Sequence, residues 1–187
     1  NGYIYKPGEA FVATATYSKK GLGVLAAVKR IDNFSFRSDR NAQQFDALIN
    51  FIPPTGNLHT YALPALYPYA TQINGEMGYQ VDVNYLIPKK SALGGKYGTK
   101  LALSVASSQS IHRAPLDDGS FGDKGTQGYV SNVLTWGEIP YFRDVNFSIS
   151  RKFSSKYKTQ VTAYRLGYNK SVLADGLNDY AILAAPD

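Results

Sequence analysis

Apolar and polar residues alternate along several stretches of the chain at the two-residue period of β-strands. The clearest stretch has apolar residues at Tyr79, Val81, Val83, Tyr85 and Ile87, and the first four of them alternate with the polar residues Gln80, Asp82 and Asn84. A second alternating stretch, with Leu101 and Leu103, follows the turn-rich residues 88–98. These two stretches are therefore predicted to form a β-hairpin.

Two further hairpins follow from the same alternation. In one, Val145, Phe147 and Ile149 share a side, and a turn at 154–158 leads into a strand over 159–169. The apolar residues of that return strand change parity after Ala163, which predicts a bulge or register shift. In the other, a strand over 11–17 turns at 18–21 into a strand over 22–36. The fold class predicted is all-β, with about six antiparallel strands in three hairpins.

The connections alternate between short and long. Short turns lie at 18–21, 88–98 and 154–158, and long loops at about 38–74 and 114–140. Transmembrane up-and-down β-barrels keep short turns on the periplasmic side and long loops outside, whereas soluble sandwiches mix loop lengths more freely. We therefore expect a segment of such a barrel, with Lys19, Lys89 and Lys156 on the periplasmic rim.

One side of the predicted strands suits lipid and the other suits water. The expected lipid-facing residues are Tyr79, Val81, Val83, Tyr85, Leu101, Leu103, Val145, Phe147 and Ile149. The residues expected to line a wet lumen are Gln80, Asp82, Asn84, Ser104, Ser148 and Ser150. The aromatic residues expected to form interfacial girdles are Tyr17, Tyr85, Tyr97, Phe153 and Tyr157 near the short turns, and Phe34, Phe36, Tyr79, Tyr141 and Phe142 near the long loops. Tyr and Phe are also good strand formers, and a soluble sandwich alternates too, so this pattern leaves that alternative open.

Composition narrows the classes of site and partner that the chain can have. The 187 residues carry a net charge of +6 and include no cysteine, which removes disulfides, thiol nucleophiles and Cys-based zinc sites. Lys and Arg occur only in small groups, so no continuous phosphate-binding track is expected and nucleic acid is not a predicted partner. The chain opens on Asn1, as a mature chain or a fragment would. Because the smallest bacterial single-chain barrels have about 8 strands, residues 1–187 are expected to be one barrel segment of a larger barrel.

Several sequence words resemble those of an uncharacterised family of Bacteroidetes outer-membrane proteins, which are longer β-rich chains. The matching words are NGYIY at 1–5, YSKKG at 17–21, KRIDNFSFRSDR at 29–40, HTYALPALYPYATQ at 59–72, GEMGYQ at 75–80 and LGGKYGT at 93–99. The resemblance weakens after about Ser110. It implies an outer-membrane location and assigns no catalytic residue.

Candidate chemistry is sparse. His59 and His112 are the only histidines, and because neither has a second ligand at a zinc-like spacing, they are expected to be exposed loop or lumen residues. Asp117, Asp118 and Asp123 do not match the calcium-loop pattern, so a solvated turn is favoured over a calcium site. Gly94, Gly95 and Gly98 resemble a phosphate cradle but lack the following GK[ST], so a tight turn is expected. No catalytic, metal or cofactor site is predicted, and the chain is not expected to be an enzyme.

The long loop over 41–74 is the best candidate for recognition. Its aromatic side chains are Phe45, Phe51, Tyr61, Tyr67 and Tyr69, interspersed with four prolines. Rigid aromatics form good binding platforms, yet a long loop also needs aromatics to pack on itself or into a barrel mouth. Packing is slightly favoured.

The hypothesis from the sequence is an outer-membrane β-barrel protein, in contact with outer-membrane lipid and other outer-membrane subunits. Its task would be that of a passive pore or a scaffold for a surface assembly. The alternative is a secreted β-sandwich that binds glycan or protein through the loop 41–74. A third possibility is a subunit whose strands complete a partner's barrel.

Overall fold

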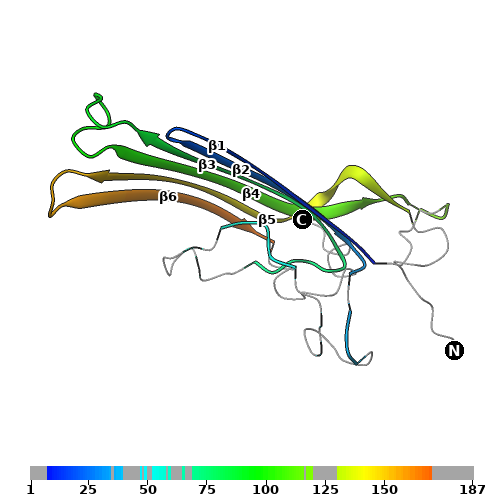
Figure 1. Cartoon of the computed structure of the whole chain (residues 1–187). Helices are drawn as coiled ribbons and strands as arrows, with labels where there is room; N and C mark the ends of the chain where they lie inside the picture. Colours follow the sequence, from blue (N-terminus) through cyan, green and yellow to red (C-terminus); the bar gives the residue numbers. More distant parts are fainter. Residues whose placement is uncertain are drawn as a thin grey trace.

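A computed structural model describes residues 8–34, 36–39, 47, 49, 52–57, 59, 65, 69–115, 117–119 and 130–169. In these ranges the chain forms one six-stranded antiparallel sheet (Figure 1). The strands are β1 (Glu9–Lys19), β2 (Leu22–Asp32), β3 (Gly75–Ile87), β4 (Thr99–Arg113), β5 (Ser131–Lys152) and β6 (Lys158–Tyr168). Each strand pairs with the next one in sequence, in the order β1-β2-β3-β4-β5-β6. This confirms the predicted all-β, up-and-down arrangement of three hairpins.

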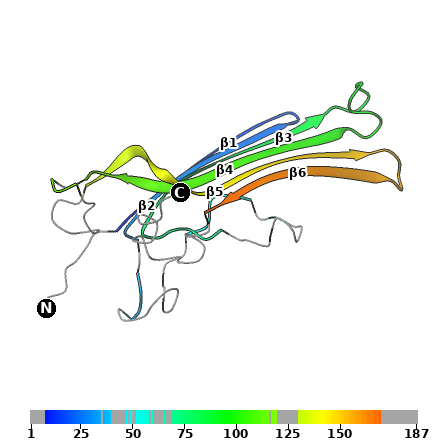
Figure 2. The same ribbon diagram turned by 180° about the vertical axis from the view of Figure 1, so that it is seen from behind.

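The sheet is open, with β1 and β6 at its two edges. The hairpin turns lie together at one end, and the described parts of the β2–β3 connection lie beneath the sheet near the other end, as Figure 1 and the reverse view in Figure 2 both show. In the described part of the chain, no helix is long and apolar enough to cross a membrane.

Glycine permits the tight turns. Gly21, in the turn between β1 and β2, has φ +81°, and its carbonyl accepts a hydrogen bond from the Leu86 N–H at 2.6 Å. Gly95 and Gly98 have φ +61° and +85°, as expected for a turn rather than a phosphate cradle. Gly94 is needed for a different reason, because a Cβ there would lie 1.9 Å from the Pro88 carbonyl oxygen.

Successive side chains point to opposite faces of the sheet, and the register aligns residues of one kind on each face. One cross-strand row is apolar on all six strands: Tyr17, Val24, Val83, Leu103, Phe147 and Ala163. We call this side the apolar face. The opposite side, which carries Gln80, Ser104 and Asn146 among others, is called the polar face.

The main buried cluster lies at the long-loop end of the sheet. It consists of Tyr69, Tyr141 and Phe142, with Ile139 and Tyr168 packed against it. Tyr141 and Phe142 were expected in an interfacial girdle, but both are buried here. The reason is that part of the long loop folds back over this end of the sheet and packs on them.

Strand β5 begins at Ser131, so the last third of the loop expected over 114–140 is a strand instead. Gly137 and Pro140 are unusual in this strand, since both residue types weaken strands. The β4–β5 pairing absorbs them through register shifts between Ser108 and Arg113. A Cβ at Gly137 would lie 2.1 Å from the Ser110 Oγ, so only glycine allows the two strands to approach at this point.

The bulge expected in the strand over 159–169 is wrong. The β5–β6 register runs without a shift from Lys152↔Lys158 to Phe142↔Tyr168. Apolar residues change parity after Ala163 because the polar face is itself covered at this end: Tyr164 meets the His59 ring edge-on, and Tyr168 packs on Phe142.

Candidate functional site: a segment docked on the polar face

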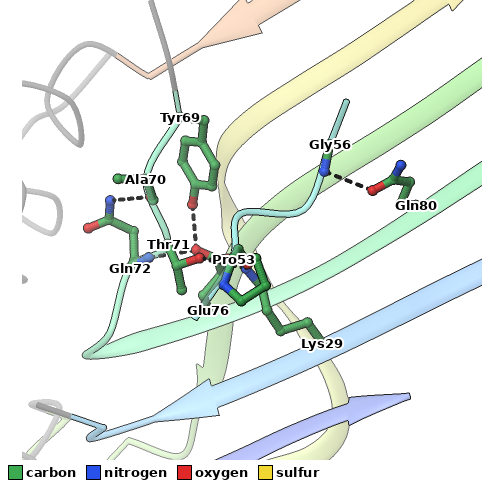
Figure 3. Close-up of polar contacts among 9 residues, drawn as sticks. All are labelled: Lys29, Pro53, Gly56, Tyr69, Ala70, Thr71, Gln72, Glu76 and Gln80. Carbon is green, nitrogen blue, oxygen red and sulfur yellow. Dashed lines mark hydrogen bonds and ion pairs between the residues drawn. The ribbon is translucent and has the colours of Figure 1, made fainter. Parts of the chain in front are cut away.

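The described part of the β2–β3 connection lies against the polar face. We define the docked segment as residues 52–57, 59 and 69–73. Figure 3 shows parts of it over β2 and β3, with the Tyr69 phenol directed toward Glu76. The contacts between this segment and the sheet form the most elaborate polar cluster among the described residues, and they are the candidate functional site.

An ion pair of buried groups lies at the centre of the site. The Lys29 Nζ is 2.7 Å from the Glu76 Oε1, and the two side chains are only 5% and 0% exposed. Lys29 lies on β2 opposite Gly78, and Glu76 lies opposite Ile31, so the two charges are diagonal neighbours on adjacent strands. Removing both charges from water is costly, and the pair persists only if further polar groups satisfy each partner.

The docked segment supplies those groups. Tyr69 donates its O–H to the Glu76 Oε2 at 2.7 Å, and the Gln72 N–H donates to the same oxygen at 2.6 Å. Lys29 in turn donates to the Thr71 Oγ1 at 2.8 Å and to the Pro53 carbonyl at 3.0 Å. The buried charges of the sheet therefore hold both ends of the docked segment (Figure 3).

Tyr69 is held by its ring as well as by its hydroxyl. The ring stacks on Phe142 with centroids 4.9 Å apart and planes 8° from parallel. Burial raises the pKa of the Tyr69 phenol well above its ordinary value, and the Glu76 carboxylate raises that pKa further. The phenol therefore keeps its proton and remains a donor to Glu76.

A glycine on β3 makes room for the segment. A Cβ at Gly78 would lie 2.7 Å from the Thr55 Oγ1 and 2.9 Å from the Ser108 Oγ, closer than side chains tolerate. Thr55 is buried in this position. Beside it, Gly56 has φ +138° and donates its N–H to the Gln80 Oε1 at 3.0 Å. The segment thus turns sharply where it meets β3.

A second contact with a buried carboxylate involves His59. Its Nε2 lies 2.7 Å from the Asp144 Oδ2, and the two side chains are 10% and 0% exposed. Asp144 also accepts a hydrogen bond from the Asn146 side chain at 3.2 Å. His59 was expected to be an exposed loop or lumen residue, and the structure places it nearly buried against β5 instead. The His–Asp pair joins sequence positions 85 residues apart.

The site also includes a chain of amides and carboxylate at its solvent edge. Gln80 donates to the Asp82 Oδ2 at 2.6 Å and to the Asn57 Oδ1 at 3.0 Å. Asn57 donates to the Asp82 Oδ1 at 3.3 Å. The Asp82 carboxylate is therefore occupied by neighbouring donors.

The residues predicted to face lipid lie together on the apolar face. The register brings Val83, Leu103 and Phe147 into one row, and Tyr85, Leu101 and Ile149 into the next. Of the predicted ligand loop, Tyr69 is buried in the docked segment, so its ring is not an open platform. The other four aromatics, Phe45, Phe51, Tyr61 and Tyr67, lie outside the described residues.

The key residues of the docked site were missed from the sequence. Lys29 lies inside the strand predicted over 22–36, Glu76 lies just before the strand predicted from Tyr79, and no local pattern connects either residue to Tyr69. One signal was available. Both residues lie on the polar face, and the residues opposite them in the β2–β3 pair are Gly78, facing Lys29, and Ile31, facing Glu76. A charge surrounded by apolar and small residues is typical of a buried pair.

The described residues contain no cluster of three His, Asp or Glu side chains that could hold a metal ion. Of the calcium candidate, Asp117 and Asp118 are described but Asp123 lies outside the described ranges. The arrangement of the docked site is suited to holding a loop in place over a sheet face, since its charged groups are directed at one another.

Comparison with known proteins gives one match. Neither the curated proteins nor the solved structures contain a match to the chain. A family model described as "Family of unknown function (DUF6029)" matches residues 1–185. Since this match covers almost the entire sequence, the chain belongs to the uncharacterised family DUF6029.

Proposed function

We propose that the chain forms part of the wall of a bacterial outer-membrane β-barrel, with its apolar face toward lipid and its polar face lining a lumen that the docked segment narrows. The role is that of a pore or a scaffold of a surface assembly, and it is not catalytic. The observation that carries the proposal is the apolar face itself. Its residues lie on every strand, and those on the central strands are exposed to a substantial degree, for example Phe147 at 40%. Such a surface requires a covering.

The extent of the apolar face fits a membrane. On β3 the apolar side runs from Met77 to Ile87 without a charge. Ten residue steps along a strand span about 34 Å, and a strand tilt of about 40° reduces this to a height of about 26 Å. The apolar band of outer-membrane barrels is about 25 Å tall. Charges bound the band at the long-loop end, where Arg30 pairs with Glu9 at 2.9 Å.

Aromatic side chains near the short turns support the same orientation. Tyr17, Tyr85, Phe153 and Tyr157 are all exposed at that end. Trp136 and Tyr79 meet edge-on, with ring centroids 5.6 Å apart, nearer the other end. Aromatic belts at both interfaces are typical of membrane barrels. Two charges on the edge strands join otherwise apolar rows: Arg165 on β6, opposite Val145, and Lys19 on β1, opposite Leu22. Arg143 on β5 also lies on this face, opposite Ser107.

The wall requires more strands. The smallest bacterial single-chain barrels have about 8 strands, and this sheet has six with open edges at β1 and β6. Further strands of the same protein, or other outer-membrane subunits, would continue it. The resemblance to Bacteroidetes outer-membrane proteins supports this location.

Arginine substitutions on the two faces test the proposal. Val83→Arg and Phe147→Arg each add a charge to the apolar face, and a midplane charge costs membrane barrels about 2 to 4 kcal/mol. We expect both variants of the native protein to fold in lipid vesicles with reduced yield and reduced resistance to SDS before heating. Ser148→Arg is the matched control, because Ser148 follows Phe147 on β5 but lies on the polar face. This variant should fold normally.

The rival to be excluded is a water-soluble sandwich, in which a second sheet covers the same apolar face. It predicts a protein that is monodisperse without detergent and that shows no heat-dependent shift on an SDS gel. Unchanged folding yield of both apolar-face variants in lipid would contradict the barrel proposal.

A further inference from the structure

An open trough lies on the polar face at the end of the sheet near the short turns. Its volume is about 540 Å³, within the range of ligand pockets. Two lysines of the polar face line it, Lys100 and Lys158, together with the hydroxyl and amide groups of Ser150 and Gln160. Lys19 also borders the trough, but its register with Leu22 assigns it to the apolar face. No carboxylate belongs to this lining. The trough is therefore a basic, hydrogen-bonding concavity.

Charge is distributed unevenly along the polar face. The carboxylates of Glu76, Asp82 and Asp144 lie toward the docked segment, and each is engaged by a partner described above. The two trough lysines, Lys100 and Lys158, have no ion pair among the described residues, and both are exposed. Their positive charge is thus left uncompensated at one end of the face.

The register places these two lysines on neighbouring parts of the polar face. Lys100 pairs with Ser150, and Ser150 pairs with Gln160 on the next strand, two residues from Lys158. Strand and residue spacings place the Cα atoms of Lys100 and Lys158 about 12 Å apart. Two lysine side chains can converge on one small anion across such a gap, with the Ser150 hydroxyl between them.

We propose that the basic trough is a binding site for small organic anions that carry carboxylate, sulfonate or phosphate groups. A role of this site in passage through the lumen rests on the proposed function, whereas anion binding itself does not. A concavity of one charge sign raises the local concentration of oppositely charged solutes. The sheet charges beneath the docked segment are engaged by partners, so they offer no competing attraction at the other end.

The test is binding of pyranine, a pyrene with three sulfonate groups, to the native protein folded in detergent, followed by fluorescence anisotropy. We expect binding at low salt that weakens as ionic strength rises and screens the lysines. Lys100→Glu/Lys158→Glu should bind at least about tenfold more weakly. Lys89→Glu, a charge reversal at an exposed turn lysine outside the trough, is the matched control and should bind as the wild type does.

A second double variant, Lys100→Gln/Lys158→Gln, keeps the test valid if the charge-reversal variant misfolds, because it removes the charges without adding repulsion. It should also lose binding of pyranine. The proposal is overturned if the wild type does not bind pyranine at low salt, or if both double variants bind it as tightly as Lys89→Glu. These outcomes are separate from the barrel proposal. A water-soluble protein that binds pyranine through these lysines would overturn the barrel alone, and a membrane barrel that does not bind it would overturn the trough alone.

Discussion

At the scale of single residues, the two buried charges Lys29 and Glu76 hold the docked segment to the sheet. Both side chains are almost entirely buried, and each charge is satisfied by groups from the segment as well as by the other charge. A buried pair of this kind adds little net stability over an apolar pair, but the loss of one partner leaves an uncompensated charge. The segment and the pair therefore depend on each other.

Glu76→Gln tests this dependence. The glutamine keeps an acceptor for the Tyr69 hydroxyl but leaves the Lys29 charge without its counterion. We expect the free energy of unfolding to fall by about 3 to 5 kcal/mol, measured by urea titration of the protein in detergent. Glu138→Gln, at an exposed carboxylate on β5, should change it by less than about 0.5 kcal/mol.

The double variant Lys29→Met/Glu76→Gln removes the stranded charge and should recover most of the lost stability. If Glu76→Gln lowers the free energy of unfolding no more than Glu138→Gln does, the ion pair does not stabilise the docked segment as described above.

At the scale of elements, local alternation was sufficient for the strands and insufficient for the loop. β3 and the 144–150 part of β5 have side chains whose period appears within a few residues, so both were predicted. The start of β5 was missed because Gly137 and Pro140 are locally unfavourable, and only pairing with β4 makes them tolerable. The docked segment depends on contacts such as His59 with Asp144, which are 85 residues apart, and no local pattern reports them.

Gly78 provides a test of how the segment is seated. Gly78→Val should expel Thr55 from its position, because the added side chain would occupy the space that its hydroxyl fills. Valine favours strands, so the sheet itself should not weaken. A cysteine introduced as Thr55→Cys is buried in the parent, and we expect Gly78→Val to raise its rate of maleimide labelling at least about tenfold, as local opening becomes cheaper by about 1.4 kcal/mol.

Gly23→Val is the matched control, since Gly23 lies on the same face and a Cβ there meets nothing within 4 Å. Labelling of Thr55→Cys should remain slow in that background. Equal labelling rates in the two backgrounds would show that the segment does not rest on Gly78.

At the scale of the whole molecule, the sheet has two faces of opposite character. Every strand contributes apolar residues to one face, while the other carries the docked segment at one end and the basic trough at the other. A single sheet with one apolar face cannot remain in water uncovered. The central claim is that lipid covers this face.

Spin labels along β5 test that claim most directly. The 187 residues contain no cysteine, so single cysteines at positions 145 to 150 provide unique labelling sites within them. In native protein reconstituted in lipid, collision with oxygen, which concentrates in the bilayer, should peak at 145, 147 and 149. Collision with a water-soluble nickel complex should peak at 146, 148 and 150. Low access of both reagents to positions 145, 147 and 149 would show that protein covers the apolar face and would contradict the account.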